Sequence, residues 1–356
     1  MTGLRLAVLL GVILAAASPA QALDPYAGID PWWVLLHEPA VVADLKLEVP
    51  QQAKFLALRD RLDLRFWPLR NKSRDEATKG FEAIVAEARR ELPMILRPAQ
   101  SQRLNEIVFW KLGTAALVRD DLAVRMRYMP AQRKRVQEIL DETQAAVTAL
   151  EQEANEGEPR EALEKKYVAL KTDEQKDILK LLKPEQRKAW QDALGKAFDS
   201  SKLGVPEYRV PELIDTGEWI NSHPLKLSEQ RGKVVIVHFY TYGCINCIRN
   251  FPWYREWSDR FKDQDVLLLG IHTPETAGER DIARVRQKAA DDKFEFPVLI
   301  DPKSENWNAW GNAMWPSVYV IDKRGYMRSF WPGELKWKGN DGEKFMRERI
   351  EALRAE

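Results

Sequence analysis

Cysteine and histidine are scarce in this chain of 356 residues, which holds two cysteines and four histidines. Two cysteines cannot build the framework of several disulfide bonds that stabilises many small secreted domains. A zinc site would need two ligands besides these cysteines, and no two histidines have zinc-ligand spacing. Haem attachment through C-x-x-C-H is excluded, because Ile248 follows the second cysteine. We therefore expect neither a metal ion nor a bound cofactor.

An excess of charge of one sign is also lacking, because 55 basic residues balance 54 acidic residues to a net charge of +1. A chain without a strong positive field has no electrostatic reason to bind nucleic acid or another polyanion. We therefore expect no nucleic-acid partner.

A long apolar run occurs at the N-terminus, where Arg5 precedes the apolar residues 6–17. The small residues Ala20 and Ala22 then flank Gln21. This pattern is typical of a secretory signal peptide with a cleavage site. The run is short for a membrane span of about 20 residues, and an uncleaved anchor is the alternative interpretation. We expect residues 1–22 to be removed and the mature protein to be periplasmic, without a membrane-spanning segment.

Residues 23–204 are predicted to form a helical domain, because they are rich in Ala, Leu, Glu, Arg, Lys and Gln. A loose Pro-x-Gln repeat occurs there at Pro50, Pro98, Pro130 and Pro184. Proline is well tolerated in a first helical turn, so each repeat predicts a helix start. The repeat resembles the L-T-x-x-Q repeats of small periplasmic helical proteins. Helix capping is one interpretation of it, and a client-binding or dimerising helical module is the other.

The composition changes after a Pro- and Gly-containing linker at 200–211, and residues 205–356 are predicted to form an α/β domain. Alternating strands and helices imply a central sheet with helices on both faces. Strands are expected at 233–240, 266–272, 296–300, 317–321 and 326–330, and helices at 248–261, 275–291 and 342–355.

The two cysteines form a C-x-x-C motif, Cys244 and Cys247, directly after the apolar run 234–240. The run predicts a buried strand and the residues after Cys247 predict a helix. Cys244 then lies at a helix N-terminus, where backbone N–H groups and the helix dipole stabilise a thiolate. The sequence therefore predicts a redox couple.

The region from about 207 to 356 resembles the thioredoxin-like family, and within it the TlpA/DipZ-like periplasmic branch. The resemblance rests on several motifs in the same order, which are Trp-Ile-Asn-Ser at 219–222, Arg-Gly-Lys-Val-Val at 231–235, the C-x-x-C stretch at 241–249, Gly-Ile-His-Thr-Pro-Glu at 270–275, Trp-Asn-Ala-Trp-Gly at 307–311 and Trp-Pro-Ser-Val-Tyr-Val-Ile-Asp at 315–322. It implies a central mixed sheet flanked by helices.

The resemblance also implies roles for individual residues. Cys244 would attack a client disulfide, and Cys247 would resolve the mixed disulfide. Pro316 would be a cis-proline that faces the cysteines. Trp315, before it, would contact an extended client segment. Gly243 leaves room for a large client beside the nucleophile. Tyr242 is a further expected client contact.

His238 is the residue at which the sequence departs from the family pattern. Much of this branch carries an aspartate six residues before the first cysteine, and His238 stands there instead. A neutral histidine could act as a base for Cys247, and a charged one could stabilise the Cys244 thiolate. The alternative is a buried histidine without a catalytic role.

The function implied by the resemblance is an exported thiol–disulfide oxidoreductase that acts on protein clients, most often as a reductant supplied by a membrane electron donor. A thiol peroxidase is one alternative, because Thr241 fits the peroxidatic P-x-x-x-T/S-x-x-C pattern, although Val237 stands where its proline belongs. The other alternative is a non-enzymatic protein whose helical domain binds clients.

Overall fold

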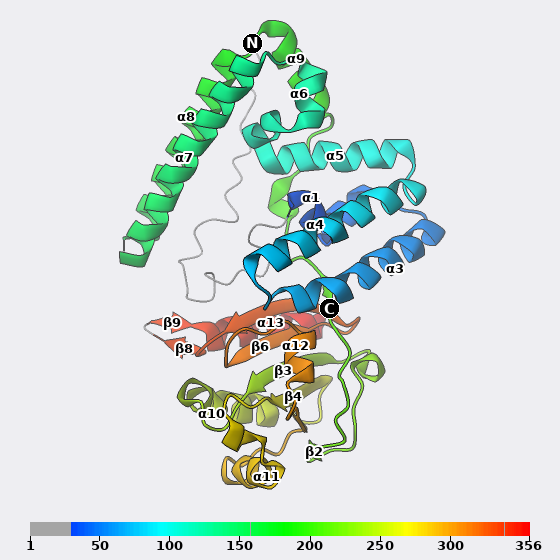
Figure 1. Cartoon of the computed structure of the whole chain (residues 1–356), viewed down its shortest axis with the longest axis vertical. Helices are drawn as coiled ribbons and strands as arrows, with labels where there is room; N and C mark the ends of the chain where they lie inside the picture. Colours follow the sequence, from blue (N-terminus) through cyan, green and yellow to red (C-terminus); the bar gives the residue numbers. More distant parts are fainter. Residues whose placement is uncertain (1–29, 157, 338) are drawn as a thin grey trace. The chain divides into compact units, whose positions relative to one another are not determined.

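The computed structural model describes residues 30–156, 158–337 and 339–356 (Figure 1). The predicted signal peptide, 1–22, lies outside the described residues. Residues 30–51 and Pro93–Gly204 form one compact unit, which we call the helical unit. Gln52–Leu92 and Val205–Glu356 form a second, which we call the sheet unit. The helical segment Gln52–Leu92 thus groups with the C-terminal region, although its composition is that of the helical region.

The helical unit is built from helices, three of which begin where the sequence repeat predicted. Its elements are α1 (Pro31–Leu35), α2 (Pro39–Asp44), α5 (Pro98–Leu112), η4 (Gly113–Val118), α6 (Asp120–Met126), α7 (Pro130–Glu156), α8 (Arg160–Leu181), α9 (Pro184–Leu194) and η5 (Ser200–Lys202). Helix α3 (Val49–Phe66) begins in this unit and continues into the sheet unit. The predicted starts at Pro98, Pro130 and Pro184 are confirmed. Helix α3, predicted to start at Pro50, begins one residue earlier.

The glutamines of the repeat cap these helices. The side-chain oxygens of Gln51, Gln100, Gln132 and Gln186 each accept a hydrogen bond, at 2.8–3.2 Å, from the backbone N–H that precedes the helix. The amides of Gln51 and Gln100 exchange hydrogen bonds at 2.9 and 3.2 Å, and those of Gln132 and Gln186 do so at 3.1 and 3.2 Å. In the first repeat Gln51 makes these contacts, not Gln52, to which the repeat pointed. Helix capping therefore accounts for the repeat.

The sheet unit contains a seven-stranded mixed sheet in the order β1-β7-β6-β3-β4-β5-β2. Its strands are β1 (Tyr208–Arg209), β2 (Trp219–Ile220), β3 (Val234–Tyr240), β4 (Val266–His272), β5 (Val298–Ile300), β6 (Ser317–Ile321) and β7 (Tyr326–Pro332). Strands β3, β4 and β5 run parallel, and β6 pairs antiparallel with β3. The short strands β8 (Lys336–Trp337) and β9 (Asn340–Asp341) form a separate hairpin.

Helices cover both faces of this sheet, as its fully buried central strand β3 requires. The helices and helical turns of the unit are α4 (Arg74–Glu91), α10 (Ile245–Arg260), α11 (Ile282–Asp291), α12 (Glu305–Ala309), α13 (Gly342–Ala355), η2 (Trp67–Leu69), η3 (Leu92–Met94, which crosses the unit boundary), η6 (Leu227–Gln230) and η7 (Ala277–Arg280). Helices α10, α11 and α13 contribute to one core, with Ile236, Val318 and Val320 of the sheet. The C-terminal region thus has the thioredoxin-like fold that the sequence resemblance predicts.

The opposite face of the sheet is covered by α12 and by the hairpin of α3 and α4. Trp67, at the tip of this hairpin, lies against Trp310 and Tyr319, with ring centroids 5.7 and 5.8 Å apart. Phe66 stacks on Tyr208 at 5.3 Å. The hairpin therefore completes the hydrophobic core on this side, and it is an integral part of the sheet unit.

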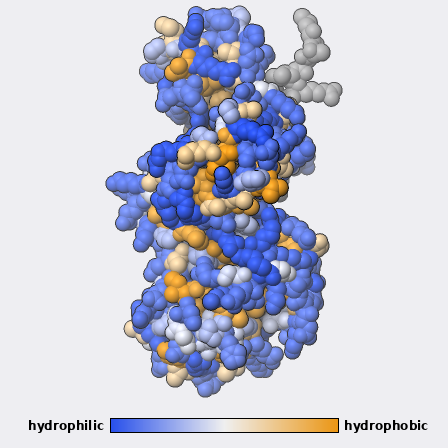
Figure 2. Space-filling model, turned by 90° about the vertical axis from the view of Figure 1, so that its right-hand side faces the viewer, coloured by the Kyte–Doolittle hydropathy of each residue, from blue (hydrophilic) through white to orange (hydrophobic). Residues whose placement is uncertain are grey.

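Among the described residues, no helix has both the length and the apolar character that a membrane crossing needs. The face seen in Figure 2 is mostly hydrophilic, with apolar residues in separate patches. This surface agrees with the charged residues that make up 31% of the chain.

Candidate redox site

The C-x-x-C motif lies where the central strand β3 passes into α10. The predicted helix start at 248 is three residues late, because α10 begins at Ile245 and Cys244 is its N-cap. The Cys247 backbone N–H donates a hydrogen bond to Cys244 Sγ at 3.3 Å. A cysteine at the N-cap of a long helix receives the free N–H groups of the first turn, which favour its thiolate.

The two cysteines differ in exposure and in acidity. Cys244 is half-buried, and hydrogen bonding from the Cys247 side chain, helped by backbone N–H groups, lowers the pKa of Cys244 to about 7. Cys247 is fully buried, and this burial raises the pKa of its thiol far above the ordinary value. One sulfur is thus prepared to attack, while the other stays protonated inside the core.

This asymmetry predicts the pH dependence of alkylation. In the reduced protein, we expect the iodoacetamide rate at Cys244 to rise with pH and level off above a midpoint near 7, because only the thiolate reacts. Cys247 should remain unlabelled at pH 9. Mass spectrometry of quenched samples measures both rates.

Two variants at the second cysteine provide the control. Cys247→Ser keeps a hydrogen-bond donor beside Cys244 and should keep the midpoint, whereas Cys247→Ala removes the donor and should raise it. Equal midpoints in the two variants would contradict the assigned cause.

Trp315 and Pro316 lie beside the residues that lead into the motif. Strand β6 begins with Ser317 opposite Phe239 of β3, so the antiparallel register places Pro316 alongside Tyr240 and Trp315 alongside the next residue. The Trp315–Pro316 peptide bond is cis, as the resemblance implied. Trp315 is half-buried and packs, like Cys244, against the core between the sheet and α10.

His238 lies on β3 inside an aromatic cluster, and its side chain is fully buried. It stacks on Tyr254 with ring centroids 4.0 Å apart and lies 5.2 Å from the Tyr240 ring. Within the described part of the chain, neither ring nitrogen has a hydrogen-bond partner. Burial lowers the pKa of His238 to about 3, so the ring is neutral at physiological pH. The lowered pKa favours the base role over the charged role at neutral pH, and the base role stays a prediction.

Tyr242 and Gly243 are held by the segment that follows β4. The Tyr242 hydroxyl donates to the Gly278 carbonyl oxygen at 3.0 Å, and its ring stacks on His272 at 5.5 Å. Gly243 is exposed, and its N–H donates to Glu279 Oε1 at 3.0 Å. A Cβ at position 243 would lie 2.5 Å from that oxygen, so a larger residue there would push the Glu279 carboxylate away.

Glu279 is the residue of this site that sequence reasoning missed. It is buried, and its other carboxylate oxygen accepts hydrogen bonds from the backbone N–H groups of Glu275 and Thr276 at 2.8 and 2.7 Å. It therefore ties the loop before Cys244 to the turn after β4. A single glutamate in a charged segment carries no sequence signal for this role.

The comparisons with known proteins place this region in a family. Residues 205–330 match the model of the AhpC/TSA family. This segment is an AhpC/TSA-family, thioredoxin-like domain. Protein DipZ of Mycobacterium tuberculosis (strain CDC 1551 / Oshkosh) is 35% identical over 128 residues, which are 35% of this chain and 18% of DipZ. The chain therefore spans less than a fifth of that relative.

Shorter relatives are matched more completely. Thiol-disulfide oxidoreductase YkuV of Bacillus subtilis (strain 168) is 26% identical over 147 residues, which are 41% of this chain and 95% of YkuV. Among solved structures, a thioredoxin-like protein in the oxidized form matches with 25% identity and a TM-score of 0.36, over 41% of this chain and 95% of that one. Each of these matches covers less than half of the chain.

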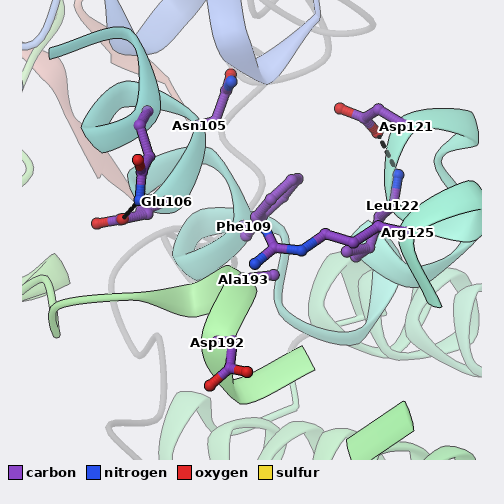
Figure 3. Close-up of a pocket in the computed structure, with 9 residues that line it drawn as sticks. Asn105, Glu106, Phe109, Asp121, Leu122, Arg125, Asp192 and Ala193 are labelled. Carbon is purple, nitrogen blue, oxygen red and sulfur yellow. Dashed lines mark hydrogen bonds between the residues drawn. The ribbon is translucent and has the colours of Figure 1, made fainter. Parts of the chain in front are cut away.

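A pocket of about 350 Å³ lies outside the AhpC/TSA domain, in the helical unit (Figure 3). Phe109, Leu122 and Ala193 form its apolar part, and Asp121, Arg125 and Asp192 are exposed charged residues around it. No cysteine or histidine lines it. Across the described residues, no group of three or more His, Cys, Asp or Glu side chains could hold a metal ion.

Proposed function

We propose that this protein is an exported thiol–disulfide oxidoreductase that reduces disulfide bonds in protein clients. The observation that carries the proposal is the pairing of a half-buried Cys244, whose pKa is about 7, with a fully buried Cys247. A thiol of this acidity is about half ionised at neutral pH and remains a good nucleophile. The named activity of YkuV agrees with this assignment.

The proposed reaction has two exchange steps. The Cys244 thiolate attacks one sulfur of the client disulfide, forms a mixed disulfide and releases the other client sulfur as a thiolate. The Cys247 thiol then loses its proton and attacks Cys244 Sγ, which releases the second client thiolate and leaves a Cys244–Cys247 disulfide. The client gains two electrons that the couple loses. A further dithiol donor, which we propose to be a membrane protein, must reduce the couple again.

Apolar side chains surround the nucleophile and fit a protein client. Ile245 and Ile248, on the first turns of α10, are 56% and 41% exposed. Trp315 lies two residues before Ser317, which pairs with Phe239 of β3, and packs against the same core as Cys244. We propose that an unfolded client segment packs against these side chains while its disulfide meets Cys244. Tyr242 and Gly243 contribute less, because their polar groups already bind the segment after β4.

The reduction potential of the Cys244–Cys247 couple tests the proposed direction. We expect a value near about −270 mV in the mature protein, as for thioredoxin, whereas a value near about −120 mV would make it an oxidant. Tryptophan fluorescence at fixed ratios of reduced to oxidised dithiothreitol reports the couple.

Two controls separate the alternative functions. Rapid consumption of hydrogen peroxide by the reduced protein would favour a thiol peroxidase instead. If no intramolecular disulfide forms, the proposed activity fails, and the client-binding interpretation of the helical unit replaces it. The repeat glutamines lend that interpretation no support, because their amides are used in capping.

A further inference from the structure

The tip of the α3–α4 hairpin contacts the segment that leads to Trp315. Arg70 Nη1 donates hydrogen bonds to the Trp310 carbonyl oxygen and to the Tyr319 hydroxyl, both at 3.1 Å. Asn71 Nδ2 donates to the Asn312 carbonyl oxygen at 3.2 Å. We call residues 67–71 the hairpin tip and residues 307–316 the proline segment. Asn71 Nδ2 also donates to Asn308 Oδ1 at 3.4 Å, so four hydrogen bonds join the tip to this segment and to strand β6.

The contact is close enough to select the residue type at position 311. Gly311 has a φ of +59°, and a Cβ there would overlap the Trp67 carbonyl oxygen and lie 2.9 Å from Arg70 Cβ. Only glycine therefore lets the backbone of the hairpin tip approach the proline segment so closely. The residue type at position 311 is therefore matched to the contact between the hairpin tip and the proline segment.

A continuous set of contacts runs from Arg70 toward the active cysteine. The Tyr319 hydroxyl accepts from Arg70 and donates to Asn312 Oδ1 at 2.7 Å, which fixes the side chain of the buried Asn312. The Asn312 N–H donates to the Trp307 carbonyl oxygen at 3.0 Å. Trp307 stacks on Trp315, with ring centroids 3.9 Å apart and planes inclined by 21°.

The hairpin also holds the edge of the same sheet. The Arg209 N–H of edge strand β1 donates to Asp63 Oδ2 at 2.8 Å, and its carbonyl oxygen accepts from Trp67 Nε1 at 2.6 Å. Both backbone groups that a further strand would use are therefore occupied. The hairpin is thus held on the AhpC/TSA domain by these hydrogen bonds, which keep its tip in place.

We infer that the hairpin tip positions the client-binding wall of the redox site, with Arg70 as a positioning residue. The inference rests on the proposed reductase function for its kinetic readout. Without Arg70, the Trp310 carbonyl oxygen and the Tyr319 hydroxyl lose their hydrogen bonds to the hairpin, and Trp315 shifts relative to Cys244. The cysteines themselves, which lie on β3 and α10, keep their own contacts and acidity.

The test compares Arg70→Met with wild type in the full chain. Methionine replaces the unbranched stem of the side chain and removes the guanidinium with its charge and hydrogen bonds. We expect kcat/KM for the reduction of insulin disulfides to fall about tenfold or more, since misplacement by about 1 Å can cost a hundredfold. The pH midpoint of Cys244 alkylation should not move. Hydrogen exchange of the 308–314 amides should accelerate, and Arg70→Lys should restore part of the rate.

Ser73→Ala is the matched control on the same hairpin. Ser73 caps α4 through Glu76, so the variant weakens the hairpin without touching the proline segment. Equal loss of activity in Arg70→Met and Ser73→Ala, or wild-type exchange and activity in Arg70→Met, would overturn the inference. If wild type itself does not reduce insulin, the reductase function fails, while hydrogen exchange still decides whether the tip holds the segment.

Discussion

Cys247→Ser should accumulate a covalent mixed disulfide with a client, whereas Cys244→Ser should form none. Cys244 has a pKa of about 7 and is half-buried, so it attacks first. Its ionised fraction at neutral pH is then about fifty times that of a thiol with the ordinary pKa of 9.0. Cys247 is fully buried with a raised pKa, so it reaches only Cys244 Sγ, after that sulfur has become bonded to the client.

The measurement is mass spectrometry of each variant after incubation with an oxidised peptide that contains one disulfide bond. We expect a one-to-one adduct with Cys247→Ser, and at least about a thousandfold lower insulin reduction for both variants than for wild type. An adduct formed by Cys244→Ser instead would reverse the assigned roles. The absence of an adduct in both variants would remove the exchange mechanism.

His238→Phe should make the protein more resistant to acid. Burial holds the pKa of His238 near 3, while the unfolded chain has the ordinary value of 6.5. Between these pH values the unfolded state binds a proton that the folded state does not. The neutral, buried His238 therefore costs no unfolding free energy above pH 6.5, and the free energy of unfolding decreases as the pH falls from 6.5 toward 3. At pH 5 the loss amounts to about 2 kcal/mol of unfolding free energy.

Denaturant unfolding at pH 7.5 and pH 5 measures this difference. The wild type should lose about 2 kcal/mol more than His238→Phe, which keeps the ring stacking on Tyr254 without a titrating group. His223→Gln serves as the control, because His223 is exposed and its variant should follow wild type. His272, which is also buried with a pKa lowered to about 4, is present in all three proteins and cancels.

The same variant tests the base role of His238. If His238 accepts the proton of Cys247, His238→Phe should slow the second exchange step and build up the mixed disulfide at neutral pH. If the rate and its pH profile stay at wild-type values, the side chain contributes only packing. The stability measurement and the kinetic measurement are independent, so one result does not fix the other.

Local patterns predicted most of the sheet unit. The apolar run 234–240 became β3, Val266–His272 and Gly342–Ala355 have the predicted bounds, and the hairpin of β6 and β7 begins at the predicted residues. These elements carry a strong pattern because each is buried along its length or along one face. The short edge strands β1 and β2 were missed, since two residues are too few for a periodicity.

The sequence by itself located the pair of cysteines on which the proposed chemistry rests. A C-x-x-C after a buried strand placed Cys244 at a helix start, and the motifs around it identified the thioredoxin-like fold and the Trp315–Pro316 partner segment. The helix start and the motifs are local features of the chain. Residue type and spacing therefore indicate them directly.

Only the tertiary structure decided which segments complete the site. Glu279 meets Gly243 across 36 positions of the chain, and Arg70 meets Trp310 across 240. Likewise, composition assigned residues 52–92 to the helical region, while their contacts place them on the sheet. A polar or charged side chain on a helix looks the same in sequence whether it faces water or a distant backbone carbonyl. What differs is the group that the side chain contacts. That group is distant in sequence, and only the folding of the chain brings it close.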